Sequence, residues 1–279
     1  KSRKYPLHLV LCKKCNLLQL KHSVLRKLLF NEGYGYKSGV NKSMRAELDD
    51  IAKKAIKLLK SQSGSIVVDI GANDGTFLSF FPKDFVRVWI EPVGKFQKEA
   101  RFHTDYLIND FFSLEAYRKS IGKRKAQIIA AISCFYDVSD LNVFVSGIAK
   151  ILDPNGILII QQNYLPMMLK NNAFDNIVHE HLTYFSLTTL ATLLGRHGLE
   201  IFDVELRSVN GGSFRTYIAR KGKRRVLNSV ALLMSQEKKL HLGSEKIYKD
   251  FYLKIKKERK RVLNFLKQLV RRGRTVYLY

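Results

Sequence analysis

The stretch Ser65-Ile-Val-Val-Asp-Ile-Gly-Ala-Asn-Asp-Gly-Thr-Phe-Leu78 decides the fold. Its β-branched apolar run breaks at Gly71 into a short polar turn, and a new apolar periodicity begins after Gly75. This pattern predicts a buried parallel strand, a tight turn and the first turn of a helix. Asp69 then stands at the carboxyl end of the strand, where open α/β sheets bind ligands. Gly71 lets the backbone approach a ligand because it has no Cβ, and Asn73 tolerates a left-handed turn.

The same turn indicates which cofactor is bound. A nicotinamide fingerprint would have glycine at positions 71, 73 and 76, whereas this chain has Gly71, Asn73 and Thr76. Glu91 ends the next apolar run, where a partner for ribose hydroxyls is expected. Asp-x-Gly-x-x-x-Gly followed by a strand that ends in Glu resembles the S-adenosylmethionine site of class I methyltransferases. The alternative is a structural turn in another doubly wound sheet.

The composition indicates a folded protein with a large positive charge. The 279 residues suffice for one large domain or two moderate ones, and 46% of them are hydrophobic. We expect no membrane span, because the chain has no apolar run of the required length. The net charge of +25 would attract nucleic acid, an anionic membrane or an anionic nucleotide-linked substrate. Three cysteines do not make a disulfide framework, which favours a cytoplasmic location.

Near the N-terminus, two extended apolar runs flank Cys12-Lys-Lys-Cys15. This arrangement is typical of a zinc knuckle, a hairpin turn that presents two thiolates. Tetrahedral zinc takes four ligands, and the sequence has no second Cys-x-x-Cys. Either the other pair lies upstream of Lys1 or the two thiols are free. We therefore expect residues 1–30 to hold half of a structural zinc site at most.

Strand-like and helix-like segments alternate after the glycine turn, which argues for a parallel sheet with helices on both faces. After the strand at 65–70, further strands are expected at residues 85–90, 106–108, 127–133 and 157–161. Ser186 caps a later helix. Two more strands, 200–207 and 213–220, flank a Gly-rich turn and should form an antiparallel pair.

Polar and aromatic residues near the strand ends suggest ligand contacts. Asp110-Phe111 follows the third strand and suits adenine, with the carboxylate for the exocyclic amine and the ring for stacking. Ser133 ends the fourth strand. Tyr34 and Tyr36 lie on a Gly-rich loop, where they could cover a ligand or be ordinary surface aromatics.

The row His179-Glu180-His181 is unusual, because a core helix does not need three titratable residues in succession. Histidine and carboxylate suit several transition metals, but adjacent residues rarely face one ion. A catalytic acid–base pair fits better, since a histidine beside a carboxylate can titrate near neutral pH. A solvated loop is the third interpretation.

The C-terminal part is strongly basic. Residues 237–274 hold fourteen Lys and Arg against four Asp and Glu, so ten of the net 25 positive charges lie there. Apolar residues from about Lys246 to Arg272 recur with helical spacing and predict a long amphipathic helix, which we interpret as a connector rather than a membrane binder. The apolar end, Thr275 to Tyr279, is predicted to be a strand.

These motifs together resemble one family. In chain order they are Cys-x-x-Cys, Tyr34-Gly-Tyr36, Asp69-x-Gly-Ala-Asn-Asp-Gly-Thr76, Ile90-Glu-Pro92, Asp110-Phe-Phe112, His179-Glu-His-Leu-Thr-Tyr-Phe-Ser186 and Gly211-Gly-Ser-Phe-Arg215. Over nearly its whole length the chain resembles the sugar C-methyltransferases, which act on nucleotide-linked 4-keto-deoxysugars. The expected organisation is a partial zinc-binding segment (1–30), a methyltransferase domain (31–222), a basic helical connector (223–274) and the first strand (275–279) of a C-terminal domain, with truncation at both ends.

The resemblance also implies the site residues. His181 would be the general base, with Glu180 beside it and Tyr36 reaching into the sugar pocket. The S-adenosylmethionine contacts would be Asp69, Gly71, Ala72, Asn73, Gly75, Thr76, Glu91, Pro92, Asp110, Phe111 and Ser133. The substrate contacts would be Tyr34, Asp137, Tyr184, Gly212 and Ser213. Family members carry a histidine near the position where this chain has Asp137. This difference affects which acceptor is expected, and it does not affect the expected methyl donor.

The leading hypothesis is therefore C-methylation of a nucleotide-activated deoxysugar for a surface polysaccharide or a glycosylated natural product. A nucleic-acid methyltransferase would exploit the positive charge, but the chain lacks an Asn/Asp-Pro-Pro-Tyr/Phe motif after the fourth strand. Its charge is also concentrated on one helix, so nucleic acid is not the expected partner. The third hypothesis is a binding module that keeps the cofactor fold without turnover.

Overall fold

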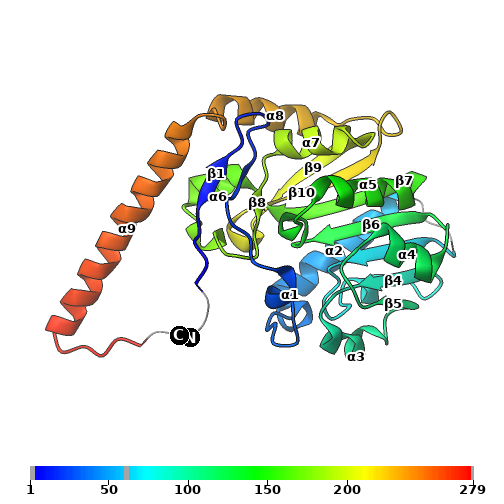
Figure 1. Cartoon of the computed structure of the whole chain (residues 1–279), viewed down its shortest axis with the longest axis horizontal. Helices are drawn as coiled ribbons and strands as arrows, with labels where there is room; N and C mark the ends of the chain where they lie inside the picture. The colour runs from blue at the N-terminus through cyan, green and yellow to red at the C-terminus, as the bar shows by residue number, and fades with distance from the viewer. Residues whose placement is uncertain (1–3, 60–62, 278–279) are drawn as a thin grey trace.

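The structure is a computed structural model that describes residues 4–59 and 63–277. Within them, seven strands form one mixed sheet in the order β5-β4-β3-β6-β7-β10-β9 (Figure 1). The parallel strands are β3 (Ile66–Ile70), β4 (Val86–Ile90), β5 (Tyr106–Ile108), β6 (Ala126–Ile132) and β7 (Leu152–Asn163). β9 (Leu199–Arg207) and β10 (Ser213–Arg220) pair antiparallel, and β10 also runs antiparallel to β7. The predicted doubly wound sheet with a terminal antiparallel pair is confirmed.

The strand order places the expected ligand crevice beside β3. From β3 the chain continues to β4 and β5 on one side, and it then crosses to β6 and β7 on the other. Ligands bind outside the carboxyl ends of the strands at such a switch point. All five residues of β3 are buried, because this strand has neighbours on both edges and helices over both faces.

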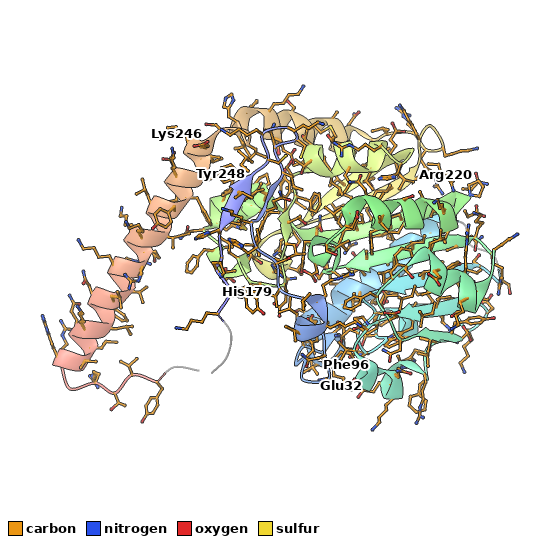
Figure 2. The ribbon with its side chains drawn as sticks, viewed as in Figure 1. Glu32, Phe96, His179, Arg220, Lys246 and Tyr248 are labelled. Carbon is orange, nitrogen blue, oxygen red and sulfur yellow. The ribbon has the colours of Figure 1, made fainter. Side chains whose placement is uncertain are left out.

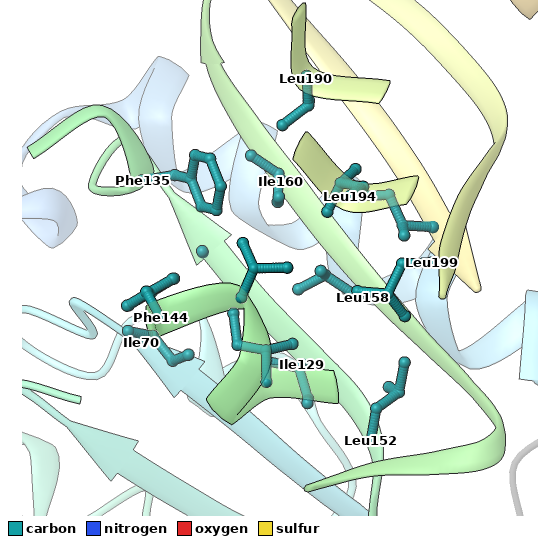
Figure 3. Packing of buried hydrophobic residues seen from close by; sticks show 14 of the residues in the cluster. Ile70, Ile129, Phe135, Phe144, Leu152, Leu158, Ile160, Leu190, Leu194 and Leu199 are labelled. Carbon is teal, nitrogen blue, oxygen red and sulfur yellow. The ribbon is translucent and has the colours of Figure 1, made fainter. Parts of the chain in front are cut away.

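Helices cover the two faces of the sheet and form two cores. On one face, α4 (Leu114–Ile121), α5 (Leu141–Ile151) and α7 (Leu187–Gly195) pack against alternate strand residues such as Ile70, Ile129 and Ile160 (Figure 3). On the other face, α2 (Lys42–Leu59) and α3 (Gln97–Ala100) pack against the intervening residues, among them Val67 and Trp89. This is the two-residue alternation expected of strands that are buried on both sides.

The remaining described elements are short or lie at the periphery. They are α1 (Arg26–Leu29), α6 (Leu165–Asn171), α8 (Asn228–Leu240), α9 (Glu245–Arg271) and the 3₁₀ turns η1 (Ser38–Val40), η2 (Leu78–Phe80), η3 (Gly94–Phe96), η4 (Phe135–Asp137), η5 (Phe174–Asn176) and η6 (Val209–Gly211). α7 begins with the predicted Ser186 cap, whose hydroxyl accepts from the Thr189 N–H in a capping box.

The helix expected after Gly75 is wrong, because only the 3₁₀ turn η2 follows the glycine turn. Pro82 explains the difference. Proline disfavours the helical conformation of the residue before it, and Phe81 is extended, with φ −92° and ψ 143°. The apolar periodicity of Phe77, Phe81 and Phe85 instead reflects burial of all three rings in the core.

The Cys-x-x-Cys hairpin is present as expected, but it is not a separate sheet. β1 (Leu9–Leu11) and β2 (Leu18–Leu20) pair antiparallel, and β2 also pairs with β8 (Thr183–Tyr184). The Leu20 N–H donates to the carbonyl of Leu182 at 2.9 Å. The N-terminal hairpin therefore shares a three-stranded sheet with the segment that follows the His-Glu-His row.

The predicted basic helix corresponds to α9, which projects away from the rest of the molecule (Figure 1). α8, which the sequence analysis did not identify, connects it to the core. The buried Glu237 of α8 accepts hydrogen bonds from the Tyr164 hydroxyl (2.8 Å) and from the Leu187 and Thr188 N–H groups (2.5 and 2.9 Å) at the start of α7. No helix in the described part, α9 included, combines the length and apolar character needed to cross a membrane.

The strand predicted at 275–279 is not seen where it can be assessed. Residues 274–277 belong to no helix or strand, and residues 278–279 lie outside the described residues. The division into domains, which includes this strand, stays a prediction.

Position 71 requires glycine for two reasons, which are its backbone conformation and the closeness of Cys134. Its φ is +71°, and a Cβ on it would lie 2.8 Å from the Cys134 Cβ. We expect Gly71→Ala to lower the free energy of unfolding by about 1–3 kcal/mol more than Gly222→Ala does. Gly222 is a matched control, because its φ is +75° and a Cβ there would meet nothing within 4 Å. Urea denaturation checks the difference, and equal losses in the two variants would contradict the steric argument.

Candidate active site

A cavity of about 950 Å³ opens at the carboxyl ends of the parallel strands, at the predicted switch point. Its walls come from the turns after β3, β4 and β6, from the loop before α2, and from the segment before β8. The predicted site residues that line it are Tyr34, Tyr36, Asp69, Gly71, Ala72, Asn73, Glu91, Pro92, Asp110, Phe111, Ser133, Asp137, Glu180 and His181. The structure thus brings most of the predicted cofactor and acceptor residues into one cavity.

Two predicted cofactor residues lie beside the cavity instead of on its wall. A Cβ on Gly75 would lie 3.0 Å from the Ala100 Cα, so this glycine permits close packing of α3. The Thr76 hydroxyl donates to Asp74 Oδ1 at 2.6 Å and is used within the turn. Both residues shape the turn without lining the cavity.

Three predicted substrate residues also lie off the wall. Tyr184 is buried in β8, and a Cβ on Gly212 would lie 2.6 Å from the Met167 Cβ. The Ser213 hydroxyl donates to the Val209 carbonyl at 3.0 Å and closes the turn between β9 and β10. Their positions give these residues packing and turn-forming roles.

Glu91 is held rigidly at the end of β4. Its carboxylate accepts the Asn73 N–H at 3.0 Å and the Val93 N–H at 2.9 Å. Burial raises the pKa of this carboxyl, and the two N–H groups act against that rise. One oxygen is thereby bound to the glycine turn after β3 and the other to the turn after β4. The carboxylate is well placed to accept from ligand hydroxyls at the crevice.

The glycine turn also anchors the tyrosine loop, which the sequence did not reveal. Asn73 Oδ1 accepts the Ser38 N–H at 3.0 Å, and Asn73 Nδ2 donates to the Tyr36 carbonyl at 3.1 Å. The Gly39 N–H donates to Asp74 Oδ2 at 2.8 Å. Asn73 and Asp74 thereby fix the loop that carries Tyr34 and Tyr36 over the cavity. The predicted contact of Asn73 with the cofactor stays a prediction.

The ring predicted to stack on adenine already has a neighbour. The Arg26 guanidinium lies over the Phe111 ring, 4.3 Å from its centroid, and Phe30 approaches the same ring edge-on at 6.3 Å. α1 therefore helps to cover this end of the cavity, a role with no signal in the sequence. Arg26 is the only Lys or Arg among the described lining residues.

Carboxyl groups predominate in the rest of the lining. They belong to Asp69, Glu91, Asp110, Asp137, Asp175 and Glu180. Burial raises the pKa of Asp69 well above its usual range, and the charges of Glu91 and Asp74 add to this effect. Carboxyl groups around a cavity favour a ligand that carries hydrogen-bond donors or a positive charge.

The His-Glu-His row is divided by the fold. His179 Nε2 lies 2.9 Å from the Tyr5 carbonyl, under the N-terminal segment (Figure 2), whereas Glu180 and His181 line the cavity. In the described part of the chain, no group of three or more His, Cys, Asp or Glu side chains is arranged to hold a metal ion. The arrangement gives no support to a metal site in this row.

His181 has a defined tautomer. Its Nδ1 lies 2.8 Å from the Asn176 carbonyl, which can only accept, so Nδ1 carries the proton. In the neutral ring, Nε2 is then the nitrogen with a free lone pair. Burial lowers the pKa of His181, which keeps the ring neutral. The Tyr136 ring packs against it with centroids 4.1 Å apart and fixes its plane.

Cys12 and Cys15 form the expected knuckle. The Cys12 N–H donates to the Leu17 carbonyl at 2.9 Å, and the Asn16 N–H donates back to the Cys12 carbonyl at 2.8 Å. Backbone N–H groups of Cys15 and Lys14 lower the pKa of the Cys12 thiol, which favours a thiolate. The donors suit zinc, but they are two of the four that it takes.

Comparison with known families identifies the two parts of the chain. Residues 38–204 match the model of the methyltransferase domain family. Residues 208–279 match that of the C-methyltransferase C-terminal domain. The two matches confirm the resemblance to C-methyltransferases that the motifs predicted.

One curated relative is C-methyltransferase NovU from Streptomyces niveus, with 28% identity over 278 residues, or 99% of this chain. The chain spans 66% of the length of that relative. Among solved structures, PH0226 protein from Pyrococcus horikoshii OT3 has a TM-score of 0.51 at 16% identity and covers 67% of this chain and 95% of its own. Magnesium protoporphyrin IX methyltransferase (ChlM) from Synechocystis PCC 6803, with bound SAH, has a TM-score of 0.50 at 13% identity and covers 67% and 91%.

At these identities the solved structures show a shared fold alone, the class I methyltransferase fold. The chain therefore belongs to the methyltransferase domain family, and this domain is followed in it by a match to the C-methyltransferase C-terminal domain.

Proposed function

We propose that this chain is the methyltransferase part of an S-adenosylmethionine-dependent enzyme that C-methylates a nucleotide-linked 4-keto-deoxysugar. The observation that carries the proposal is Nε2 of His181, which has a free lone pair in the neutral form of this half-buried imidazole, in the cavity that also contains the Glu91 turn. A base that removes a proton from carbon must be unprotonated and held in place. The lowered pKa of His181 supports the first condition, and its contact with the Asn176 carbonyl supports the second.

The residues present fit S-adenosylmethionine. Glu91 would accept from the ribose hydroxyls, Asp110 and Phe111 would border the adenine, and Gly71 gives access to the backbone of the turn. The acidic wall suits a positively charged methyl donor. When bound, S-adenosylmethionine supplies an electrophilic methyl group on its sulfonium.

Other residues that line the cavity would act on the methyl acceptor. His181 Nε2 takes the proton α to the ketone, and negative charge develops on the ketone oxygen. Donors near that oxygen stabilise the charge. Burial raises the pKa of both Tyr34 and Tyr36, so their hydroxyls remain protonated and can donate. Glu180 lies on the same wall and would balance the imidazolium.

Two further assignments belong to this proposal. Cys12 and Cys15 would supply two of the four ligands of a structural zinc site. Nucleic acid is not favoured as the acceptor, because the basic helix α9 contributes no residue to the cavity and projects away from the rest of the molecule (Figure 1).

The cofactor site is tested by titrating the protein with S-adenosylhomocysteine in a calorimeter. We expect saturable binding that Glu91→Ala weakens by about 10- to 150-fold, since hydrogen bonds to a charged group contribute about 1.5–3 kcal/mol. Glu115→Ala, at an exposed position of α4, is the matched control and should bind like the wild type. Unchanged affinity in a folded Glu91→Ala variant would contradict the assignment.

The acceptor class is tested by methyl transfer from labelled S-adenosylmethionine. Transfer to carbon of a nucleotide-linked 4-keto sugar, with none to the matching 4-hydroxy sugar, is the expected result. Transfer to DNA or RNA instead, or to neither sugar, would overturn the proposal.

A further inference from the structure

Asp137 is the feature of the cavity that the proposed chemistry leaves unused. It ends η4, directly after β6, and lines the cavity. Its Oδ1 is buried and has no hydrogen-bond partner among the described residues. A buried polar atom without a partner is costly, so its presence at a cavity wall indicates that a ligand completes it.

The backbone around Asp137 is tied to the segment that carries the base. The Tyr136 carbonyl accepts the Leu182 N–H at 3.0 Å and the Thr183 hydroxyl at 3.2 Å. The Tyr136 ring packs on the ring of His181. Asp137 and His181 therefore belong to one rigid assembly, and a ligand within reach of one is positioned relative to the other.

The surroundings of Asp137 contain acids and no cation. In the described part of the chain, the titratable groups that interact with it are Glu180, Cys134, Tyr34, Tyr136 and Tyr184. An ionised Asp137 would be a buried negative charge next to a second carboxylate, with nothing to compensate it. Burial, and then the Glu180 charge, raise the pKa of Asp137 well above its usual range. This setting favours the protonated carboxyl, which is a hydrogen-bond donor.

We propose that the Asp137 carboxyl donates a hydrogen bond to the acceptor oxygen that becomes negative when His181 removes the α-proton. The proposal rests on the proposed function and adds to it a catalytic residue and a requirement on the acceptor, which must present a ketone oxygen to Asp137. The proton moves from carbon to His181 Nε2, and the bonding pair passes to the ketone oxygen. Asp137 keeps its own proton throughout. The carbon would then form its bond to the methyl group while the bond from that group to the donor sulfur breaks with its electron pair left on sulfur, and the ketone would re-form.

Two variants distinguish whether Asp137 acts as a hydrogen-bond donor or as a negative charge. Asp137→Asn keeps the shape and an N–H donor, whereas Asp137→Leu keeps much of the shape without a donor. We expect Asp137→Leu to lower kcat by about 10²–10³-fold, as for loss of one oxyanion donor, with little change in KM. Asp137→Asn should stay within about tenfold of the wild type. Affinity for S-adenosylhomocysteine, which involves other residues, confirms that each variant is folded.

The pH profile gives a second readout. Wild-type kcat should fall on the alkaline side as Asp137 ionises and loses its donor proton, and Asp137→Asn should lack this fall. A protonated carboxyl band in the infrared difference spectrum of wild type minus Asp137→Asn, recorded at neutral pH without substrate, tests the protonation directly.

The outcomes distinguish the two proposals. An inactive wild type would overturn the proposed function, and the role of Asp137 with it. An active wild type would support the proposed function. The role of Asp137 would then be overturned by any of three results: full activity in Asp137→Leu, equal loss of kcat in both variants, or absence of the protonated carboxyl band.

Discussion

His181→Asn is expected to lower kcat for methyl transfer by about 10²–10⁴-fold, the usual effect of removing a general base. Asparagine places its amide nitrogen near the position of His181 Nδ1, so the bond to the Asn176 carbonyl (2.8 Å in the native chain) can persist. The nitrogen with the free lone pair is lost. The variant therefore removes the base while it keeps the local contact.

His179→Asn is the matched control. His179 contacts the Tyr5 carbonyl and does not line the cavity, so this variant should keep near-native kcat. Equal losses in the two variants would show that the row acts through folding and not through one base. Affinity for S-adenosylhomocysteine should be unchanged in both.

The pH dependence of the wild type follows from the same residue. Burial lowers the pKa of His181 below its ordinary 6.5, and the hydrogen bond to Asn176 offsets this only in part. A base with a lowered pKa stays neutral as the solution is acidified. Activity should therefore hold through pH 6.5 and fall only as the pH drops through the lowered pKa. His181→Asn should lose this acid limb, which a pH series of kcat measures.

Arg215→Met is expected to lower the free energy of unfolding by about 3–5 kcal/mol, the effect of removing one partner from a buried ionic network. The side chain of Arg215 is fully buried. Its guanidinium donates to Gln161 Oε1 (2.7 Å), Asp50 Oδ2 (2.7 Å) and Glu47 Oε1 (2.8 Å). It thereby joins β7 and β10 to α2. Without it, Arg207 is the one ion-pair partner that the buried Glu47 keeps among the described residues.

Urea denaturation measures this loss. Lys53→Met is the matched control on α2, since Lys53 forms an exposed pair with Asp49 and should change stability by at most about 0.5 kcal/mol. A loss below about 1 kcal/mol for Arg215→Met would contradict the role assigned to the network.

The network also predicts how stability responds to acid. Hydrogen bonds from Arg215 lower the pKa of Asp50, while for Glu47 the bonds from Arg207 and the charge of Arg215 outweigh the effect of burial. Both folded-state pKa values lie below the ordinary ones. The contribution of these carboxylates is thus present above their ordinary pKa values and is lost as the pH falls through the folded ones. Arg215→Met should flatten this acid dependence.

Much of the sheet could be predicted from local pattern. β5 was predicted with its exact bounds, and β3, β4 and β6 to within one residue, because buried β-branched runs carry their own signal. The helix after Gly75 was wrong because Pro82 overrides the apolar periodicity. β8 has two residues and no pattern, so its pairing with β2 arises only from tertiary contact.

The candidate site could likewise be predicted from the sequence only in part. The strand ends identified Asp69, Glu91 and Asp110, because topology brings the carboxyl ends of parallel strands together. The anchoring of the tyrosine loop by Asn73 and Asp74 connects positions about 35 residues apart, which no local motif encodes. The proton on His181 Nδ1 likewise depends on a carbonyl whose position the sequence does not reveal.

The pairing of β2 with β8 limits which segments of this protein can be exchanged with those of a relative. Gln19 pairs with Thr183 and Leu18 with Tyr184, two and three residues beyond His181. An exchange of the N-terminal hairpin between relatives, or its removal, would replace or remove the strand that pairs with the segment after His181. A chimaera joined near residue 30 would take β2 and β8 from different parents, so its three-stranded sheet would depend on how well the two strands match.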